Sequence, residues 1–228
     1  MKTKRSIKKF ISTLLTVAVI LAGGLFAAAP EPAYAMNTTD LINHIKNFDH
    51  GGTGSLSARF SMNGSNIIHV SGTVTGATNV LSLDIDSGVT VQWAADYSGS
   101  VNQMIILSGA GTFEVASGSI SNSGSITIQL ADSSTVAVKV SGGTVSCEHG
   151  NAISGYGFCE NNITVSGGTV SSTTDKAIES SYASSTINIS GNSLVFGCGT
   201  NISGSGSSVD DAVIVGSPTI SGNAVVCA

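Results

Sequence analysis

Two aspartates on one predicted strand are the first residues whose spacing suggests chemistry. Asp84 and Asp86 alternate with Leu83 and Ile85 in the stretch LSLDIDSGVTV, so both carboxylates should lie on the outward face of a strand. Carboxylate oxygens are ligands that Ca²⁺ prefers, and the two aspartates could supply half of a calcium site. The alternative is an ordinary solvated strand face.

Four cysteines offer thiol or disulfide chemistry: Cys147, Cys159, Cys198 and Cys227. They occupy different repeat positions, and the chain has no Cys-x-x-Cys or other metal-binding spacing. Cys147 and Cys159 could form a disulfide that closes the loop EHGNAISGYGF between them. The alternative is a set of small, buried, reduced thiols packed among Val and Ile side chains.

Four aromatic residues could bind the flat faces of sugar rings. Tyr156 and Tyr182 each follow an Ala-Ile pair, and this shared position predicts that they stack in one loop column. Trp93 and Tyr97 make a second pair. These four residues are the candidate ligand-binding residues, and the alternative is an aromatic ladder that contributes only stability.

A repeat of about 25 residues positions most of these side chains. The hexapeptide VSGGTV occurs twice, and VASGSI, ISGNSL and VGSPTI extend the series, which starts at positions 115, 140, 165, 189 and 215. The offsets are therefore 25, 25, 24 and 26. A unit of this length buries its apolar face only by stacking on its neighbours. Apolar residues alternate with Ser, Thr and Lys in each copy, which indicates strands.

One position of the repeat is typical of a turn between two short strands. Gly118, Gly143 and Gly168 share it, and Asn192 takes it in the fourth copy. Three short strands in each coil predict an all-β fold, a right-handed parallel β-helix, for residues 65–228.

The motif alignment also predicts which residues face outward. Thr144, Thr169 and Thr219 should form one outward column, with Val145, Val170 and Ile220 inward. Thr and Ser on a flat face are also typical of ice-binding proteins, which gives one alternative function. An ordinary solvated strand surface explains the same pattern.

The residues before the repeats indicate export and a cap. A basic start, an apolar run over 10–29 and the cleavage site Ala33-Tyr34-Ala35 predict a signal peptide over residues 1–35, with no membrane span after its cleavage. Residues 36–64 are the expected N-terminal cap segment, with a helix over 41–48 that covers the first coil. No comparable cap follows the last strand-like stretch, so we expect self-association through the C-terminal end.

Charge restricts the partners. After residue 35 the chain carries four basic and thirteen acidic residues, a formal net charge of −9. Nucleic acids and other anionic polymers are not expected as partners, because phosphate contacts require Lys and Arg in number. A glycan or a host or cell-surface protein is the expected partner.

The stretch from Val80 to Ala228 resembles bacterial secreted and surface right-handed β-helix proteins of pectin-lyase-like fold, whose repeats carry SGGTV-type motifs. The resemblance is strongest at VSGGTV (140 and 165) and at LSLDIDSGVTV (81–91). It implies the fold. For function it implies either non-catalytic adhesins and stalks or polysaccharide lyases and hydrolases.

The hydrolases of that fold offer a closer comparison. The segment EHGNAISG, with His149, resembles the GHG segment of polygalacturonase-like enzymes, and Asp210-Asp211 resembles their paired aspartates. In that family the aspartates precede the histidine and an Arg-x-Lys element follows it, whereas the order is reversed here and no Arg follows Arg59.

A pectate-lyase-type site would need an Arg or Lys base beside clustered aspartates, and Lys139 and Lys176 have no such cluster in their repeat positions. We therefore predict no catalytic residues and no cofactor. The predicted function is a secreted or cell-surface non-catalytic β-helix module, adhesin- or stalk-like. A polysaccharide lyase or hydrolase is the alternative.

Overall fold

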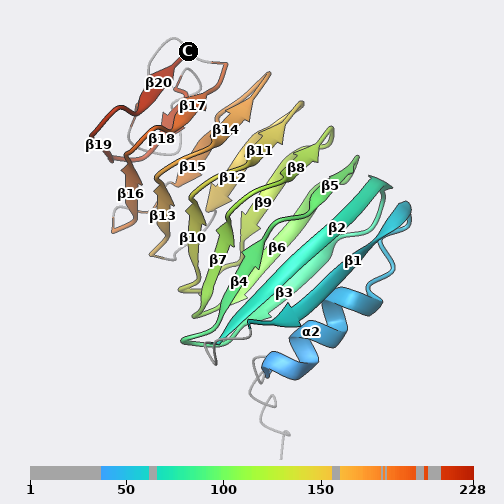
Figure 1. The fold of residues 1–228 in the computed structure, drawn as a ribbon. Helices are drawn as coiled ribbons and strands as arrows, with labels where there is room; N and C mark the ends of the chain where they lie inside the picture. The colour runs from blue at the N-terminus through green and yellow to red at the C-terminus, as the bar shows by residue number, and fades with distance from the viewer. Residues whose placement is uncertain are drawn as a thin grey trace, which may run out of the picture. The chain divides into compact units, whose positions relative to one another are not determined.

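The computed structural model describes residues 37–61, 66–155, 160–180, 182, 184–198, 203–204 and 212–228. The predicted signal peptide lies outside the described residues. The described chain forms a parallel β-solenoid with one short helix at its N-terminal end (Figure 1). Successive coils place Val115, Val140 and Val165 side by side, at the period that the motif copies predicted. The predicted parallel β-helix is confirmed.

The solenoid has three faces, because each coil contributes up to three strands. Face 1 comprises the first half of β2 (Ile67–Ala77), β4 (Thr90–Trp93), β7 (Thr112–Val115), β10 (Ala137–Val140), β13 (Asn162–Val165), β16 (Thr186–Ile189) and β19 (Pro218–Ile220). Face 2 comprises the second half of β2, β5 (Asp96–Gly99), β8 (Ser119–Asn122), β11 (Thr144–Cys147), β14 (Thr169–Ser172), β17 (Leu194–Phe196) and β20 (Val225–Cys227). Face 3 comprises β3 (Leu81–Ile85), β6 (Gln103–Gly109), β9 (Ile126–Leu130), β12 (Asn151–Gly155), β15 (Ile178–Ser180) and β18 (Ile214–Val215).

The N-terminal end is covered by α2 (Thr38–Asn47) and β1 (Thr53–Phe60). Asn37 caps α2, because its Oδ1 accepts hydrogen bonds from two N–H groups of the first turn. The apolar side of the helix, formed by Leu41, Ile42 and Ile45, is buried. The predicted cap helix is confirmed, with a start three residues earlier than expected. The antiparallel pairing of β1 with β2 was not predicted from the sequence.

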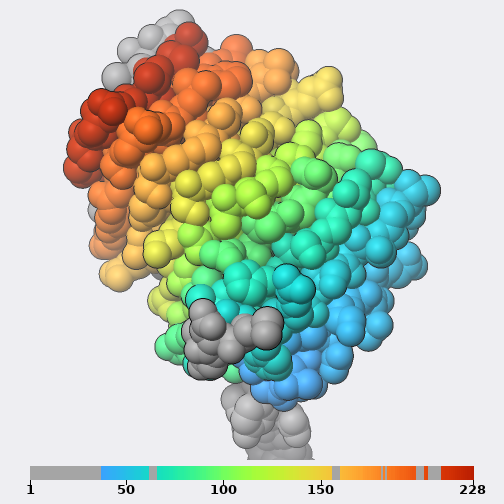
Figure 2. Space-filling model, viewed as in Figure 1, coloured from blue at the N-terminus to red at the C-terminus, as the bar shows by residue number. Residues whose placement is uncertain are grey.

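Each face contributes at least one continuous apolar column to the core, since alternate residues of a strand point inward. Neighbouring residues of a column are strand partners in successive coils, and Figure 2 shows these coils from outside as successive coloured bands. The column of face 1 contains Val70, Trp93, Val115, Val140, Val165 and Ile189. That of face 2 contains Val74, Tyr97, Ile120, Val145, Val170 and Val195. That of face 3 contains Leu81, Ile105, Ile128, Ile153, Ile178 and Ile214.

The predicted turn glycines are confirmed. Gly118, Gly143 and Gly168 have φ values of 71°, 66° and 70°, the left-handed region that glycine adopts at no steric cost. In the next coil the prediction was wrong, because Gly191 (φ 65°) and not Asn192 takes this conformation. The strand after this turn therefore begins one residue later than the motif alignment implied.

The fifth motif copy was also placed wrongly. Thr144 and Thr169 are strand partners on face 2, as predicted, but Thr219 lies on face 1 opposite Asn188. Ile220 is the partner of Ile189, so the offset between these two coils is 31 rather than 26. The reason is the long connection between β17 and β18, which a constant period does not anticipate.

Candidate ligand-binding groove

The outward side of face 3 carries a groove of about 530 Å³. Strands from four successive coils line it, together with the start of the loop that follows β9. The lining residues are Gln103, Ile106, Ile126, Gln129, Leu130, Ala131, Asp132, Ser154 and Glu179. Four of them, Ile106, Gln129, Ser154 and Glu179, are strand partners in one row across β6, β9, β12 and β15.

Glu179 is held in place by its neighbours. Its Oε2 accepts a hydrogen bond of 2.6 Å from Nδ2 of Asn151 and a longer one of 3.5 Å from Oγ of Ser154. Asn151 is only 8% exposed, and its Oδ1 has no hydrogen-bond partner among the described residues. The carboxylate of Glu179 is therefore oriented before any ligand arrives.

The floor of the groove is polar and buried at its centre. Gln129 is 7% exposed, and its Nε2 donates a hydrogen bond of 2.8 Å to the carbonyl of Leu130. This bond uses one of the two N–H donors of the amide and leaves the second N–H and the acceptor Oε1 of Gln129 for other partners. Ile106, Ile126 and Leu130 supply apolar surface beside it.

Asp132 places a second carboxylate at the groove. It is exposed and lies in a tight turn, in which the N–H of Ser134 donates to the carbonyl of Ala131 and Ser133 has a φ of 63°. None of the lining residues within the described chain is Lys, Arg or His. The groove therefore combines two carboxylates, two amides and a hydroxyl with an apolar patch and carries no cation.

The sequence contains a signal for this row at the repeat period. Gln129, Ser154 and Glu179 recur at a constant offset of 25, so they share one repeat position. Reading the outward polar residues at the repeat period would have predicted that they are neighbours. The alternation pattern alone did not, because Ser154 lies in the strand NAISG, which is buried on both sides.

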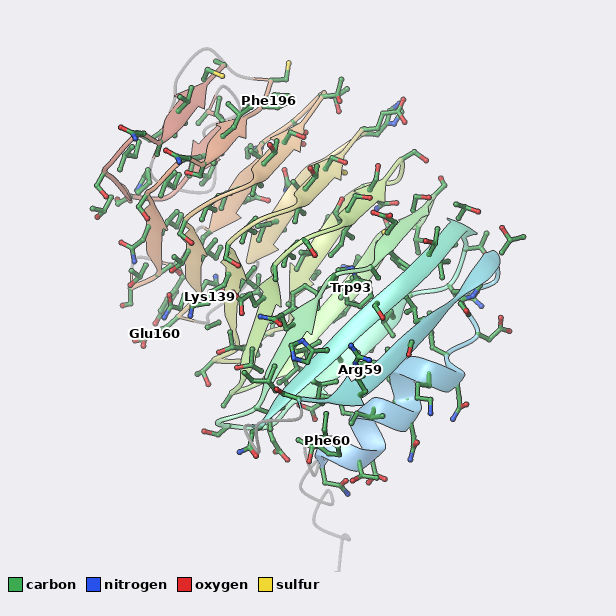
Figure 3. All side chains as sticks on the ribbon, viewed as in Figure 1. Arg59, Phe60, Trp93, Lys139, Glu160 and Phe196 are labelled. Carbon is green, nitrogen blue, oxygen red and sulfur yellow. The ribbon has the colours of Figure 1, made fainter. Side chains whose placement is uncertain are left out.

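Trp93 and Tyr97 were predicted to bind a ligand, and the structure corrects this. Both are fully buried, so neither ring is open to solvent (Figure 3 labels Trp93). Their rings meet edge to face at 5.8 Å between centroids, and Phe113 lies 5.7 Å from Trp93. Both residues occupy inward columns. The 25-residue period did not predict this position, because the early coils are shorter than the later ones.

The other predicted aromatic pair is only partly placed. Tyr182 is half-buried, whereas Tyr156 lies outside the described residues. Their stacking therefore stays a prediction. The residues that resemble a hydrolase site are also only partly described. His149 is exposed and its Nδ1 lies 3.2 Å from the carbonyl of Ser123, whereas Asp210 and Asp211 lie outside the described residues.

The two aspartates predicted to bind calcium gain no third Asp, Glu, His or Cys partner among the described residues. Asp84 and Asp86 lie at the end of β3 and are both half-buried. Nowhere in the described ranges do three His, Cys, Asp or Glu side chains come together to hold a metal ion.

The cysteines fall into two environments. Cys147 is buried, its Sγ donates to the carbonyl of Gly124 at 3.4 Å, and burial raises its pKa. Cys198 and Cys227 are free and exposed, which corrects the expectation that all the thiols are buried. Cys147 is also a free thiol, which corrects the predicted disulfide with Cys159; Cys159 itself lies outside the described residues.

Face 2 bears on the ice-binding alternative. Ser119, Thr144 and Thr169 do form one outward column. The same column continues as Leu194 and Val225, which breaks the hydroxyl array. We find no specific support for an ice-binding function in this face.

Comparisons with protein-family models, with curated proteins and with solved structures gave no match. Within the described ranges, no helix has the length and apolar character needed to cross a membrane.

Proposed function

We propose that the protein is a secreted or cell-surface, non-catalytic β-helix module that binds a glycan in the groove on face 3. The observation that carries the proposal is the row of Gln129, Ser154 and Glu179 beside an apolar patch. A sugar presents hydroxyl donors at its edge and C–H groups on its faces, and a mostly apolar surface with a few fixed polar groups is typical of ligand sites.

The stacked coils support an adhesin-like role. Residues of the groove come from parallel strands and not from long loops, apart from the turn that carries Asp132. A site built on such strands needs little ordering when it binds, which reduces the entropic cost of association.

The test is to measure glycan binding by residues 36–228 on an array, followed by calorimetry with each hit. Gln129→Leu, which removes the floor acceptor at similar volume, should weaken binding about tenfold. The matched control is Gln92→Leu, the same change on the outward side of face 1, which should leave affinity unchanged. Equal affinities for the two variants, or the lack of any glycan ligand, would reject the proposal.

A polysaccharide hydrolase is the second candidate, since Asp132 and Glu179 line the same groove. Two carboxyl groups that flank one bond are the machinery of glycoside hydrolysis. Release of reducing ends from any bound glycan, abolished by Asp132→Asn and by Glu179→Gln, would favour this candidate over a binding module. We expect no release.

A further inference from the structure

We infer that the groove on face 3 selects saccharides that carry free, positively charged amino groups over N-acetylated or acidic saccharides. This inference rests on the proposed glycan-binding function and names the class of sugar. It follows from the donors and acceptors that the groove offers, from its charge and from the support behind Glu179.

The side chains that line the groove offer more hydrogen-bond acceptors than free donors. The carboxylates of Glu179 and Asp132 can only accept hydrogen bonds when ionised. The carbonyl of Leu130 uses one of the two N–H donors of Gln129, and the hydroxyl of Ser154 donates to Glu179, so the donors left to a ligand are the second N–H of Gln129 and the amide of Gln103. A complementary ligand must therefore bring donors, and an ammonium group brings three on one atom.

The negative charge of the groove also favours a ligand that carries an ammonium group. Two carboxylates line it, and no lining residue in the described chain is cationic. The closest basic residue in the sequence to Glu179, Lys176, has its Nζ 3.0 Å from Asp175, and Lys139 lies on face 1. A uronic acid would meet like charge here, which disfavours binding, whereas an ammonium group would form a charge-assisted hydrogen bond.

The carboxylate of Glu179 is held in a fixed orientation by a buried neighbour. Asn151, more than nine-tenths buried, donates to it at 2.6 Å. Gln129, also more than nine-tenths buried, lies in the same row as Glu179 and lines the groove with a side-chain oxygen that can accept a hydrogen bond. Two buried amides thus frame an acceptor site beside the apolar surface of Ile106 and Ile126, which suits the C–H face of a pyranose ring.

The test compares three oligosaccharides of equal length in calorimetry at mildly acidic pH: a glucosamine oligomer, its fully N-acetylated form and an oligogalacturonate. The glucosamine oligomer should bind at least about tenfold more tightly than either of the others. Asp132→Asn, which changes an exposed residue, and Glu179→Gln should each reduce that preference. Asp84→Asn, a carboxylate on face 3 outside the groove, should leave it unchanged.

The outcomes separate the inference from the function on which it rests. Binding of the N-acetylated oligomer or of the galacturonate as tightly as of the glucosamine oligomer would overturn the inference and keep a glycan-binding module. Binding of poly-lysine with the same dependence on Asp132 and Glu179 would overturn it in favour of a peptide ligand. No binding of any saccharide would overturn both. A melting curve for each variant ensures that a lost preference is not lost folding.

Discussion

One corner of the solenoid shows how different side chains can take the same position. Asn122, Cys147 and Ser172 are strand partners in three successive coils. Each donates a hydrogen bond to a carbonyl of the preceding coil, namely that of residue 101, 124 or 150. Cys147 therefore plays the same role as an asparagine and a serine of its own chain, and its thiol acts as a small buried donor.

The environments of the thiols predict their reactivity. In the folded protein a maleimide should label Cys198 and Cys227 rapidly and Cys147 only after unfolding, because the thiolate is the reactive form and burial raises the pKa of Cys147. Peptide mass spectrometry after timed labelling measures this. Labelling of Cys147 at the rate of Cys198 would contradict its burial.

Tyr97 carries a polar group that the core does not satisfy. Its hydroxyl is buried and has no hydrogen-bond partner among the described residues. Tyr97→Phe should therefore raise the free energy of unfolding by about 1 kcal/mol, since it removes the desolvation cost of the hydroxyl. Chemical denaturation at neutral pH measures the change, and a loss of stability would show that the hydroxyl has a partner.

The same residue predicts the response to alkali. Burial raises the pKa of Tyr97 from its ordinary 10.0 to about 12. The folded state thus favours the neutral phenol, so this contribution to stability is intact below pH 10 and is lost as the pH rises toward 12. The Phe variant should lose less stability than the original protein over this interval, in denaturation curves taken at each pH. Parallel losses in the two proteins would exclude Tyr97 as the cause.

The coils turn at glycines that have a positive φ. Two of these glycines distinguish the cost of the left-handed backbone from the cost of close packing between coils. A Cβ on Gly143 would lie 2.6 Å from the carbonyl oxygen of Gly118, and its φ is 66°. Gly88 has a similar φ of 77°, but nothing lies within 4 Å of its Cβ position. Gly88→Ala should cost about 1 kcal/mol from the left-handed backbone alone. Gly143→Ala should cost more than this, about 2–3 kcal/mol, because the neighbouring coil must also move.

Urea denaturation of both variants measures the difference. If both alanine variants lost the same stability, close stacking of the coils at this turn would not be the reason for glycine.

The coils were predictable from the sequence where their length is constant. Over positions 115–172 the period does not change, so strands, inward valines and turn glycines all followed from the pattern. The prediction failed where the length changes: Trp93 is the partner of Val115 at an offset of 22, and Ile220 follows Ile189 at 31. The groove was missed because its row crosses four coils and shows no local motif.

The two ends of the solenoid differ in how they are covered. At the N-terminal end α2 and β1 pack against the first coil. At the other end β18, β19 and β20 are the outermost strands of their sheets in the described chain. Three apolar side chains of β17, β19 and β20 are exposed at this end: Phe196 (38%), Ile220 (42%) and Val225 (53%) (Figure 3 labels Phe196). Exposed edges with apolar neighbours are templates for association.

We therefore expect residues 36–228 to self-associate through this end. Val225→Lys should reduce the association, because it puts a charge on the outward side of the last coil, whereas Val226 packs against the core. The control is Thr144→Lys, in the same outward column but in the middle of the solenoid. Light scattering over a concentration series measures the effect, and a monomeric parent protein or equal behaviour of both variants would reject it.

The groove on face 3 also has a mechanical consequence. The strands run across the solenoid axis, so the hydrogen bonds between coils lie along that axis. Tension applied to the two ends would therefore separate the coils one after another. A saccharide lying along the groove would contact β6, β9, β12 and β15 at once and so connect four coils. A bound saccharide would therefore raise the force needed to separate these four coils, because opening any one of them would also break contacts with the ligand.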